Sequence, residues 1–144
     1  MDNRYNKQAQ KQNDARQKLD AFREFLNKAD SFSNADQVEL VEKYAEPLGS
    51  IFADMRINRS QIRSFYDTVL QISYQSEDDE QKIALQLAYL RAKTAYKRAQ
   101  RHITKEFEQF IEACTKAIRS ARDFEAFVRF FEAVYAYHYV NAKS

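Results

Sequence analysis

Six lysine and arginine side chains lie between residues 89 and 105, in the segment YLRAKTAYKRAQRHITK, which contains no aspartate or glutamate. The whole chain is nearly balanced, with 23 basic and 21 acidic side chains, so the positive charge is concentrated here. Basic side chains without acidic partners bind anions, and a cluster of them favours contact with the phosphate backbone of a nucleic acid. The six are Arg91, Lys93, Lys97, Arg98, Arg101 and Lys105.

On a helix these basic residues fall into two rows, because each residue turns the helix by about 100°. Lys93 and Lys97 form one row, a single turn apart. The other row follows one broad flank and consists of Arg91, Arg98, Arg101 and Lys105. The two rows do not form one tight stripe, but they surround the polar side of the predicted helix with positive charge.

A second basic cluster precedes this segment. Arg59 and Arg63 are one turn apart near the start of the preceding predicted helix, and Arg56 lies just before them. If the two helices are antiparallel neighbours, the start of one lies near the end of the other, and the two clusters merge into a single patch. Tyr66 and Tyr96 would be available for base stacking beside such a patch, although their spacing favours core positions.

The charge pattern by itself leaves three interpretations open. The basic patch could hold a nucleic-acid backbone, it could dock an acidic surface of a partner protein, or it could be a solvated helix surface. A pure protein–protein scaffold is therefore the alternative to RNA binding, and salt dependence alone does not separate the two, because both are electrostatic.

The sequence contains no recognisable catalytic, metal-binding or cofactor-binding motif. A single glycine excludes a glycine-rich phosphate loop, and one cysteine with two histidines excludes the usual Cys/His zinc spacings. Cys114 falls on an apolar helical stripe and is expected to be a buried thiol. His138, within the tyrosine-rich YAYHY, is expected to be a packed or partly exposed histidine and not a catalytic one. The acidic run at 77–80 is expected to be a solvated helix start. We therefore expect a protein that is not an enzyme, with no cofactor.

The elements that carry these residues are predicted to be helical. One glycine and one proline in 144 residues are too few for sheets and long loops. Apolar residues make up 44% of the chain and aromatic residues 14%, which indicates a folded core rather than disorder. The length predicts a single helical domain over 1–144. Without an apolar run of membrane-spanning length, a signal peptide or a second cysteine, the expected setting is the cytoplasm and no membrane partner.

Apolar spacing predicts a compact bundle of five or six helices. Residues 1–13 are expected to be disordered or the frayed start of a helix that is clear from 14 to 29. A short helix through Val38 and Tyr44 is expected to stop before Pro47. Longer helices are expected from Asn58, an N-cap with Gln61 as its reciprocal partner, to about 74, then from about 81 to 101, from 103 to 118, and from Ser120 to 138. The core stripe expected for the helix of 81–101 consists of Ile83, Leu87, Leu90, Ala95 and Tyr96.

Three blocks in this order resemble the small subunit of type III-A CRISPR–Cas (Csm) effector complexes. They are RSQIRSFYDTVLQI (59–72), LAYLRAKTAYKRAQR (87–101) and FEAFVRFFEAVYAYHYV (124–140). The last block is the most specific, and the resemblance covers residues 56–141. One departure is the run KRAQR after the tyrosine of the second block, where small residues, often including glycine, would be expected before the arginine.

The resemblance implies a non-catalytic helical bundle, several copies of which line the inner filament of an RNA-guided effector complex. It implies guide RNA and target RNA as partners, together with the other subunits of the complex, and self-association as a dimer or through filament contacts. Sequence is read by base pairing, so the subunit need only recognise shape and phosphate. The residues expected to contact RNA are Arg59, Arg63, Arg91, Lys93, Lys97, Arg98 and Arg101. The third block is expected to pack through Phe124, Phe127, Phe131, Val134 and Tyr137.

Overall fold

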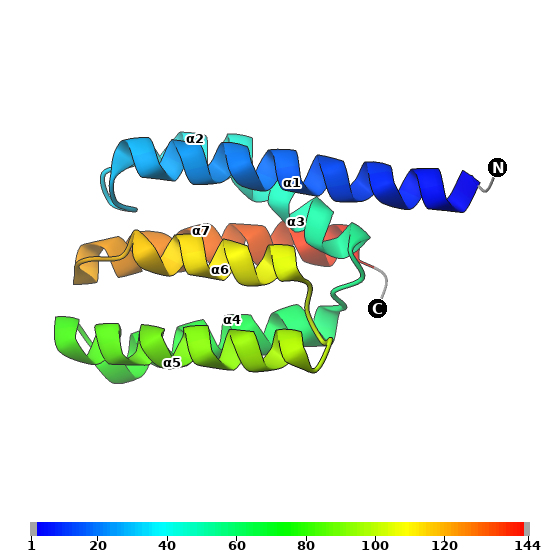
Figure 1. Cartoon of the computed structure of the whole chain (residues 1–144). Coiled ribbons are helices and arrows are strands. Elements are labelled where there is room, and N and C mark those ends of the chain that lie inside the picture. Colours follow the sequence, from blue (N-terminus) through cyan, green and yellow to red (C-terminus); the bar gives the residue numbers. More distant parts are fainter. Residues whose placement is uncertain (1–2, 143–144) are drawn as a thin grey trace.

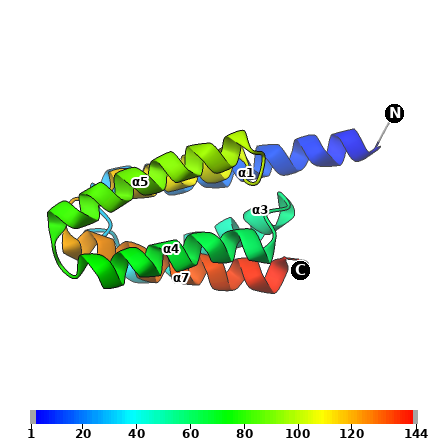
Figure 2. The same cartoon turned by 90° about the horizontal axis from the view of Figure 1, so that it is seen from below.

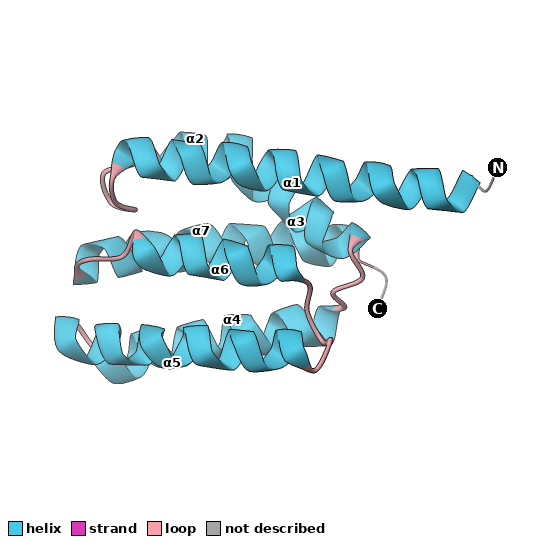
Figure 3. Cartoon of the chain, viewed as in Figure 1, coloured by secondary structure: helices cyan, strands magenta, loops and turns pink. Residues whose placement is uncertain are grey.

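The computed structural model describes residues 3–142, and within this range every regular element is a helix (Figures 1 and 3). Six helices have nine or more residues, which confirms the predicted all-α bundle of five or six helices. In chain order the elements are α1 (Asn3–Ala29), α2 (Gln37–Glu39), the π-helical segment η1 (Leu40–Ala45), α3 (Glu46–Asp54), α4 (Arg59–Ser76), α5 (Glu80–Ala99), α6 (Lys105–Lys116) and α7 (Ala121–Asn141).

Helix α7 is the centre of the bundle. It packs against α3 on one side and α4 on the other, while α1 lies on α3 and α6 (Figure 1). Helix α5 lies at the outside, where it packs on α4 and α6 and reaches α7 only at its edge (Figure 2). No helix within residues 3–142 combines the length and the apolar character needed to cross a lipid bilayer.

The core is built largely of phenylalanine rings. Phe22 of α1 stacks on Phe130 of α7 with ring centroids 5.2 Å apart, and Phe52 of α3 meets Phe107 of α6 edge to face at 5.0 Å. Offset and edge-to-face contacts of this kind add to the free energy of burial. The packing role expected for the third block is confirmed: the first four residues are buried and the last is half-buried against the core, namely Phe124, Phe127, Phe131, Val134 and Tyr137.

Local capping signals define where the helices begin. The Asn58 side chain accepts a hydrogen bond from the Gln61 amide at 2.8 Å, and the Gln61 side chain accepts one from the Asn58 amide at 3.0 Å. This is the predicted reciprocal cap, which satisfies two of the amides that a helix start leaves free. Ser120 likewise accepts a hydrogen bond from the Asp123 amide at 3.1 Å at the start of α7.

The predicted stop before Pro47 is wrong. Pro47 lies in the first turn of α3, and helical structure runs from Gln37 through it without a break. Proline lacks an amide hydrogen and clashes with the carbonyl group four residues earlier. The preceding six residues, Leu40–Ala45, form a π-helical segment, whose wider turn accommodates such a disruption. The backbone hydrogen bonds therefore follow the π-helical pattern before Pro47, and the helix continues into α3.

The predicted inner face of α5 is wrong at its C-terminal end. Thr94 is buried, and its hydroxyl group donates to the Leu90 carbonyl oxygen, whereas Ala95 and Tyr96 are exposed. Tyr96 is 63% exposed, so it is not a core residue. Tyr66, by contrast, is half-buried and stacks on Tyr135 with centroids 4.7 Å apart, as its core spacing predicted. Helix α5 thus presents apolar residues on both its inner and its outer face.

The first part of α1 extends beyond the rest of the bundle (Figure 1). The helix begins at Asn3, so residues 3–13 belong to it, and residues 1–2 lie outside the described range. Side chains 6–14 are all exposed, and Ala15 is the first buried residue among the side chains from position 6 onwards that the structure describes. Because residues 6–14 bury little apolar surface, tertiary packing stabilises this part of the helix less than the part from Ala15 onwards.

Candidate nucleic-acid interface

Helices α4 and α5 are antiparallel neighbours, which is the arrangement that a single basic patch requires (Figures 1 and 2). Lys93 of α5 donates from its ammonium group to the hydroxyl oxygen of Thr68 in α4 at 3.0 Å. The start of α4 therefore lies beside the end of α5. We call this end of the molecule, where α3 ends, α4 begins and α5 ends, the basic end. The basic side chains gathered there are Arg56, Arg59, Arg63, Lys97 and Arg101.

Arg59 is turned away from α5 and towards α7. Its guanidinium group donates to the carbonyl oxygen of Tyr139 from Nη2 at 2.9 Å and from Nε at 3.2 Å. The same group lies 4.0 Å from the centroid of the Tyr139 ring, a cation–π contact. Arg59 therefore ties the start of α4 to the end of α7, and only part of its donor capacity remains for another ligand.

Arg91 and Arg98 lie on the flank of α5 that faces α6. Arg98 forms an ion pair with Glu108, with Nε 2.7 Å from the carboxylate oxygen. Arg91 lines a shallow cavity of about 300 Å³ between these helices together with Glu108 and Glu112. The pKa of Glu112 is lowered from its ordinary value, mainly by the hydrogen bond and charge of Lys116, with a smaller contribution from Arg91. The positive charge of Arg91 and Arg98 is thus offset by acidic side chains of α6, which the sequence of α5 alone could not reveal.

Four predicted RNA contacts have no hydrogen bond or ion pair through their side chains among the described residues 3–142. Arg91 is one of them and lies on the flank of α5 beside Glu108 and Glu112. The other three lie at the basic end and are Arg63, Lys97 and Arg101. Arg63 and Arg101 are exposed, and Lys97 is half-buried. Their charge remains available to a ligand at the basic end, whereas Arg59 and Arg98 are engaged within the protein and Lys93 bridges to α4.

Two arginines at the basic end occupy the left-handed backbone region. Arg56 has φ 67° and Arg101 has φ 63°, and each follows the last turn of a helix. The next residues close the helix ends: the Ile57 amide donates to the Phe52 carbonyl group, and the His102 amide donates to the Lys97 carbonyl group. This capping geometry normally uses glycine, because a β-carbon is unfavourable there. In both places the chain instead directs an arginine side chain into solvent.

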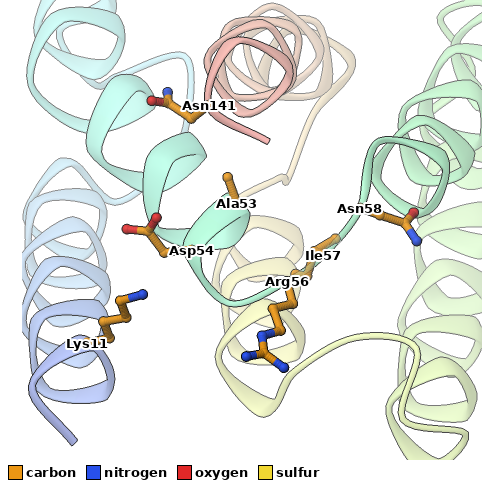
Figure 4. Close-up of a pocket in the computed structure, with 7 residues that line it drawn as sticks. All are labelled: Lys11, Ala53, Asp54, Arg56, Ile57, Asn58 and Asn141. Atoms are coloured by element: carbon orange, nitrogen blue, oxygen red, sulfur yellow. The ribbon is translucent and has the colours of Figure 1, made fainter. Parts of the chain in front are cut away.

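An open cavity of about 410 Å³ lies beside this end of the bundle (Figure 4). Figure 4 shows Lys11 of α1 and Asp54 of α3 on one wall and Arg56 nearby, on the chain that leaves α3. A second cavity of about 160 Å³ is also lined by Lys11, Asp54 and Arg56, so the two cavities share part of their lining. The full lining of the larger cavity is Lys11, Ala53, Asp54, Arg56, Ile57, Asn58 and Asn141.

Sequence reasoning did not include Lys11 or Arg56 among the candidate contacts. Lys11 is 45 positions before Arg56 in the chain, and only the packing of α1 along α3 brings the two to one cavity. Arg56 lies just before Arg59 and Arg63 in the sequence, and this position was the only sequence signal that it could belong to the same basic patch. Both residues add to the positive charge of the basic end, and Asp54 opposes it.

The side chains that could in principle act in catalysis are buried in the core or cap a helix. Cys114 is fully buried, and burial raises the pKa of its thiol well above the ordinary value, so the reactive thiolate is disfavoured. His138 is fully buried, and its Nε2 atom is hydrogen-bonded to the Ile57 carbonyl oxygen. Asp79 of the acidic run caps α5 by accepting from the amides of Gln81 and Lys82. Within residues 3–142, no group of histidine, cysteine and acidic residues has the geometry of a metal site.

A family model described as Csm2 Type III-A matches residues 35–144, which is most of the chain. The match begins after α1 and includes every element from α2 to α7, so it extends further towards the N-terminus than the three sequence blocks. No curated protein and no solved structure matches the chain.

Proposed function

The chain belongs to the Csm2 family, the small subunits of type III-A CRISPR–Cas effector complexes, and from that membership we propose that it holds RNA by the phosphate backbone at its basic end. In this proposal it lines the inner filament of the complex beside the guide–target RNA duplex. It performs no chemical step and holds no cofactor. Its partners are the guide RNA, the target RNA and the other subunits.

The observation that carries the proposal is the set of unengaged cations at one end of the bundle. Arg63 lies in α4, Lys97 in the last turn of α5 and Arg101 just after it, and none of the three has a side-chain hydrogen bond or ion pair within residues 3–142. Phosphate contacts are strongest when a cation is not already neutralised by a carboxylate. These three residues are therefore the primary contacts in the proposal, with Arg56 as a fourth.

The other predicted contacts have supporting roles. Lys93 is fixed by Thr68, and Arg59 by the Tyr139 carbonyl group, so each holds a helix in place as well as contributing charge. Arg98 and Arg91 face the carboxylates of α6, which reduces their attraction for a second anion. Among the seven predicted contacts, we therefore expect the strongest RNA contacts from the side chains whose charge is least engaged within the protein.

Backbone contact suits a subunit of an RNA-guided complex. The guide reads the target by base pairing, so a neighbouring protein must accept any sequence. Lysine and arginine side chains meet this requirement, because phosphates occur at every nucleotide whatever the base. A base-reading pocket would oppose the function, since it would restrict the targets.

Fluorescence anisotropy with labelled RNA of two unrelated sequences tests the proposal. We expect similar affinity for both sequences and a steep loss of affinity as salt rises. The double variant Lys97→Glu with Arg101→Glu should lose at least tenfold in affinity at low salt. Its salt slope should fall by about 0.7–0.9 for each phosphate that is no longer neutralised. Helicity measured by circular dichroism should stay unchanged, because both side chains lack internal partners.

The matched control reverses two lysines at the other end of the bundle. Lys28→Glu with Lys116→Glu makes the same change in net charge at side chains that are 77% and 71% exposed. This variant should keep most of the RNA affinity. An equal loss in both double variants would mean that net charge and not the basic end governs binding. Absence of binding at low salt would overturn RNA contact by the subunit and favour an acidic protein partner.

A further inference from the structure

The connection between α3 and α4 spans residues 55–58 and carries part of the charge of the basic end. Arg56 and Ile57 are neighbours on the chain that leaves α3 (Figure 4), and Arg59 begins α4. The Ile57 side chain is 1% exposed, whereas Arg56 is exposed and Arg59 is half-exposed. Because Ile57 is anchored in the core between them, its position sets where the backbone of both arginines lies.

The carbonyl group of Ile57 is held by α7. It comes before Asn58, the N-cap of α4, so it lies outside the backbone hydrogen bonds of that helix. The Nε2 atom of His138 donates to this carbonyl oxygen, which can only accept. A buried carbonyl group without a donor would be destabilising. The connection is therefore most stable in the position in which His138 reaches it.

The imidazole group of His138 makes one hydrogen bond in the core. Its ring is fully buried, and its Nδ1 atom has no hydrogen-bond partner within residues 3–142. Since Nε2 carries the hydrogen, Nδ1 is an unprotonated acceptor whose lost contact with water is not replaced. An apolar side chain at this position would avoid that cost. The polar contribution that His138 makes is therefore the hydrogen bond to Ile57.

His138 is itself held in place. Gly49 of α3 packs against its backbone nitrogen, and its ring lies in the core. The next residue of α7, Tyr139, accepts the hydrogen bonds of the Arg59 guanidinium group at its carbonyl oxygen. Two consecutive residues of α7 thus fix positions 57 and 59, on both sides of the N-cap of α4. The bond from His138 is the one that holds the connection itself, because Arg59 already belongs to α4.

We propose that His138 is a positioning residue that latches the connection 55–58 to α7 and thereby sets the RNA affinity of the basic end, a role that rests on the RNA contact proposed above. With the latch formed, the side chains of Arg56 and Arg59 extend from one fixed backbone, and less conformational freedom is lost when phosphate binds. Without the bond from His138, the connection samples other positions. The two cations must then be ordered at the moment of binding, which weakens it.

Trypsin cleavage tests the latch without RNA. Arg56 and Arg101 are both exposed, and each follows the last turn of a helix, with φ of 67° and 63°. Only the peptide bond after Arg56 leads into a residue that His138 holds. His138→Met removes the donor at similar volume, so cleavage after Arg56 should rise about fivefold or more relative to cleavage after Arg101, because the connection opens locally. His138→Gln, whose amide group can donate, should restore most of the wild-type ratio.

The control loses stability without touching the connection. Phe124→Leu changes a buried side chain near the start of α7, at the opposite end of that helix from His138. It lowers the free energy of unfolding, and its cleavage ratio should stay close to that of the wild type. No rise of the ratio in His138→Met, or an equal rise in Phe124→Leu, would overturn the latch. If His138→Met does not fold, the wild type decides: it should be cut faster after Arg101 than after Arg56, and the reverse order would overturn the latch.

RNA anisotropy on the same proteins, each shown to be folded by circular dichroism, tests the effect on binding. His138→Met should lose about three- to tenfold in affinity, whereas His138→Gln and Phe124→Leu should stay within about twofold of the wild type. Unchanged affinity in His138→Met, or an equal loss in Phe124→Leu, would overturn the positioning role. A wild type that does not bind RNA would overturn the RNA contact and with it this role, whereas the cleavage ratio decides separately whether His138 holds the connection.

Discussion

Gly49 of α3 packs directly on the backbone of His138 in α7. A β-carbon built on Gly49 would lie 2.8 Å from the His138 backbone nitrogen and 2.7 Å from the Val134 carbonyl oxygen. Both are backbone atoms of a helix, so rotation of a side chain cannot relieve the contact. The one glycine of the chain therefore serves the close crossing of two helices, and its φ is not positive.

Gly49→Ala should lower the free energy of unfolding by about 1–3 kcal/mol, the usual cost of overpacking. At an exposed helical position the same change would raise it by about 0.5–1 kcal/mol, because glycine is a poor helix former. Denaturant unfolding followed by circular dichroism measures the sign. Ser50→Ala, at the half-exposed next position, is the control and should change the stability little. A stabilised Gly49→Ala protein would contradict the close crossing.

The buried imidazole of His138 should make stability depend on pH. Burial lowers the pKa of His138 from its ordinary value of about 6.5, the nearby charge of Arg59 lowers it further, and the hydrogen bond to Ile57 opposes the shift. The unfolded chain therefore binds a proton at a higher pH than the folded chain does. The contribution of the neutral His138 side chain to the free energy of unfolding is therefore present above about pH 6.5. It is lost as the pH falls from this value through the lower pKa of the folded protein.

Unfolding midpoints between about pH 8 and pH 5 test this dependence. His138→Gln should be less stable than the wild type at the upper end, and the difference should narrow towards the lower end, since glutamine does not titrate. His102→Gln, at an exposed histidine, is the control and should follow the wild-type curve. A constant difference across the range would rule out titration of the buried imidazole as the cause.

Asp123 connects two parts of the chain 90 residues apart. Its Oδ1 atom accepts a hydrogen bond from the Ser33 amide at 2.9 Å and another from the Ser33 hydroxyl group, and its Oδ2 atom accepts one from the Arg119 amide at 3.0 Å. Burial favours the neutral carboxyl group, but the hydrogen bonds from Ser33 and Arg119 outweigh it, and the pKa of Asp123 is lowered from its ordinary value of about 3.8.

Asp123→Asn should therefore lower the free energy of unfolding by about 1–3 kcal/mol at neutral pH, because an amide group cannot accept at both atoms and one part-buried backbone donor loses its partner. The contribution of the native carboxylate is present above about pH 3.8 and is lost as the pH falls through this value. Thermal unfolding of the two proteins should thus differ at neutral pH and converge in acid. Glu125→Gln, at an exposed carboxylate two positions further on, is the control and should cost much less.

Arg101→Gly should change stability and RNA affinity in opposite directions. Glycine relieves the left-handed backbone and should raise the free energy of unfolding by about 1 kcal/mol, while the loss of one free cation weakens RNA binding and lowers the salt slope by about 0.7–0.9. Glu77→Gly relieves a positive φ of 46° at the other end of α4 and should stabilise without loss of affinity. Unchanged affinity in Arg101→Gly would remove this residue from the proposed contacts.

Helix starts could be predicted from sequence because their cause is local. Asn58 and Gln61 form a reciprocal cap through side chains three residues apart, which depends on no other part of the fold. Pro47 shows the limit of the same reasoning. A proline disfavours a helix locally, but packing of Leu48 and Gly49 against α7 keeps the segment helical, and the preceding π-helical turn absorbs the disruption.

The sequence by itself determined the all-helical class, the capped helix starts and the concentration of positive charge, because each follows from composition or from neighbours within one or two turns. Only the tertiary structure decided which cations stay free, since Arg98 meets Glu108 and Arg59 meets Tyr139 across different helices. It also decided which side of α5 faces the core. That helix has apolar residues on two sides, so its periodicity fits either choice, and contacts with α4 and α6 select Thr94 over Tyr96.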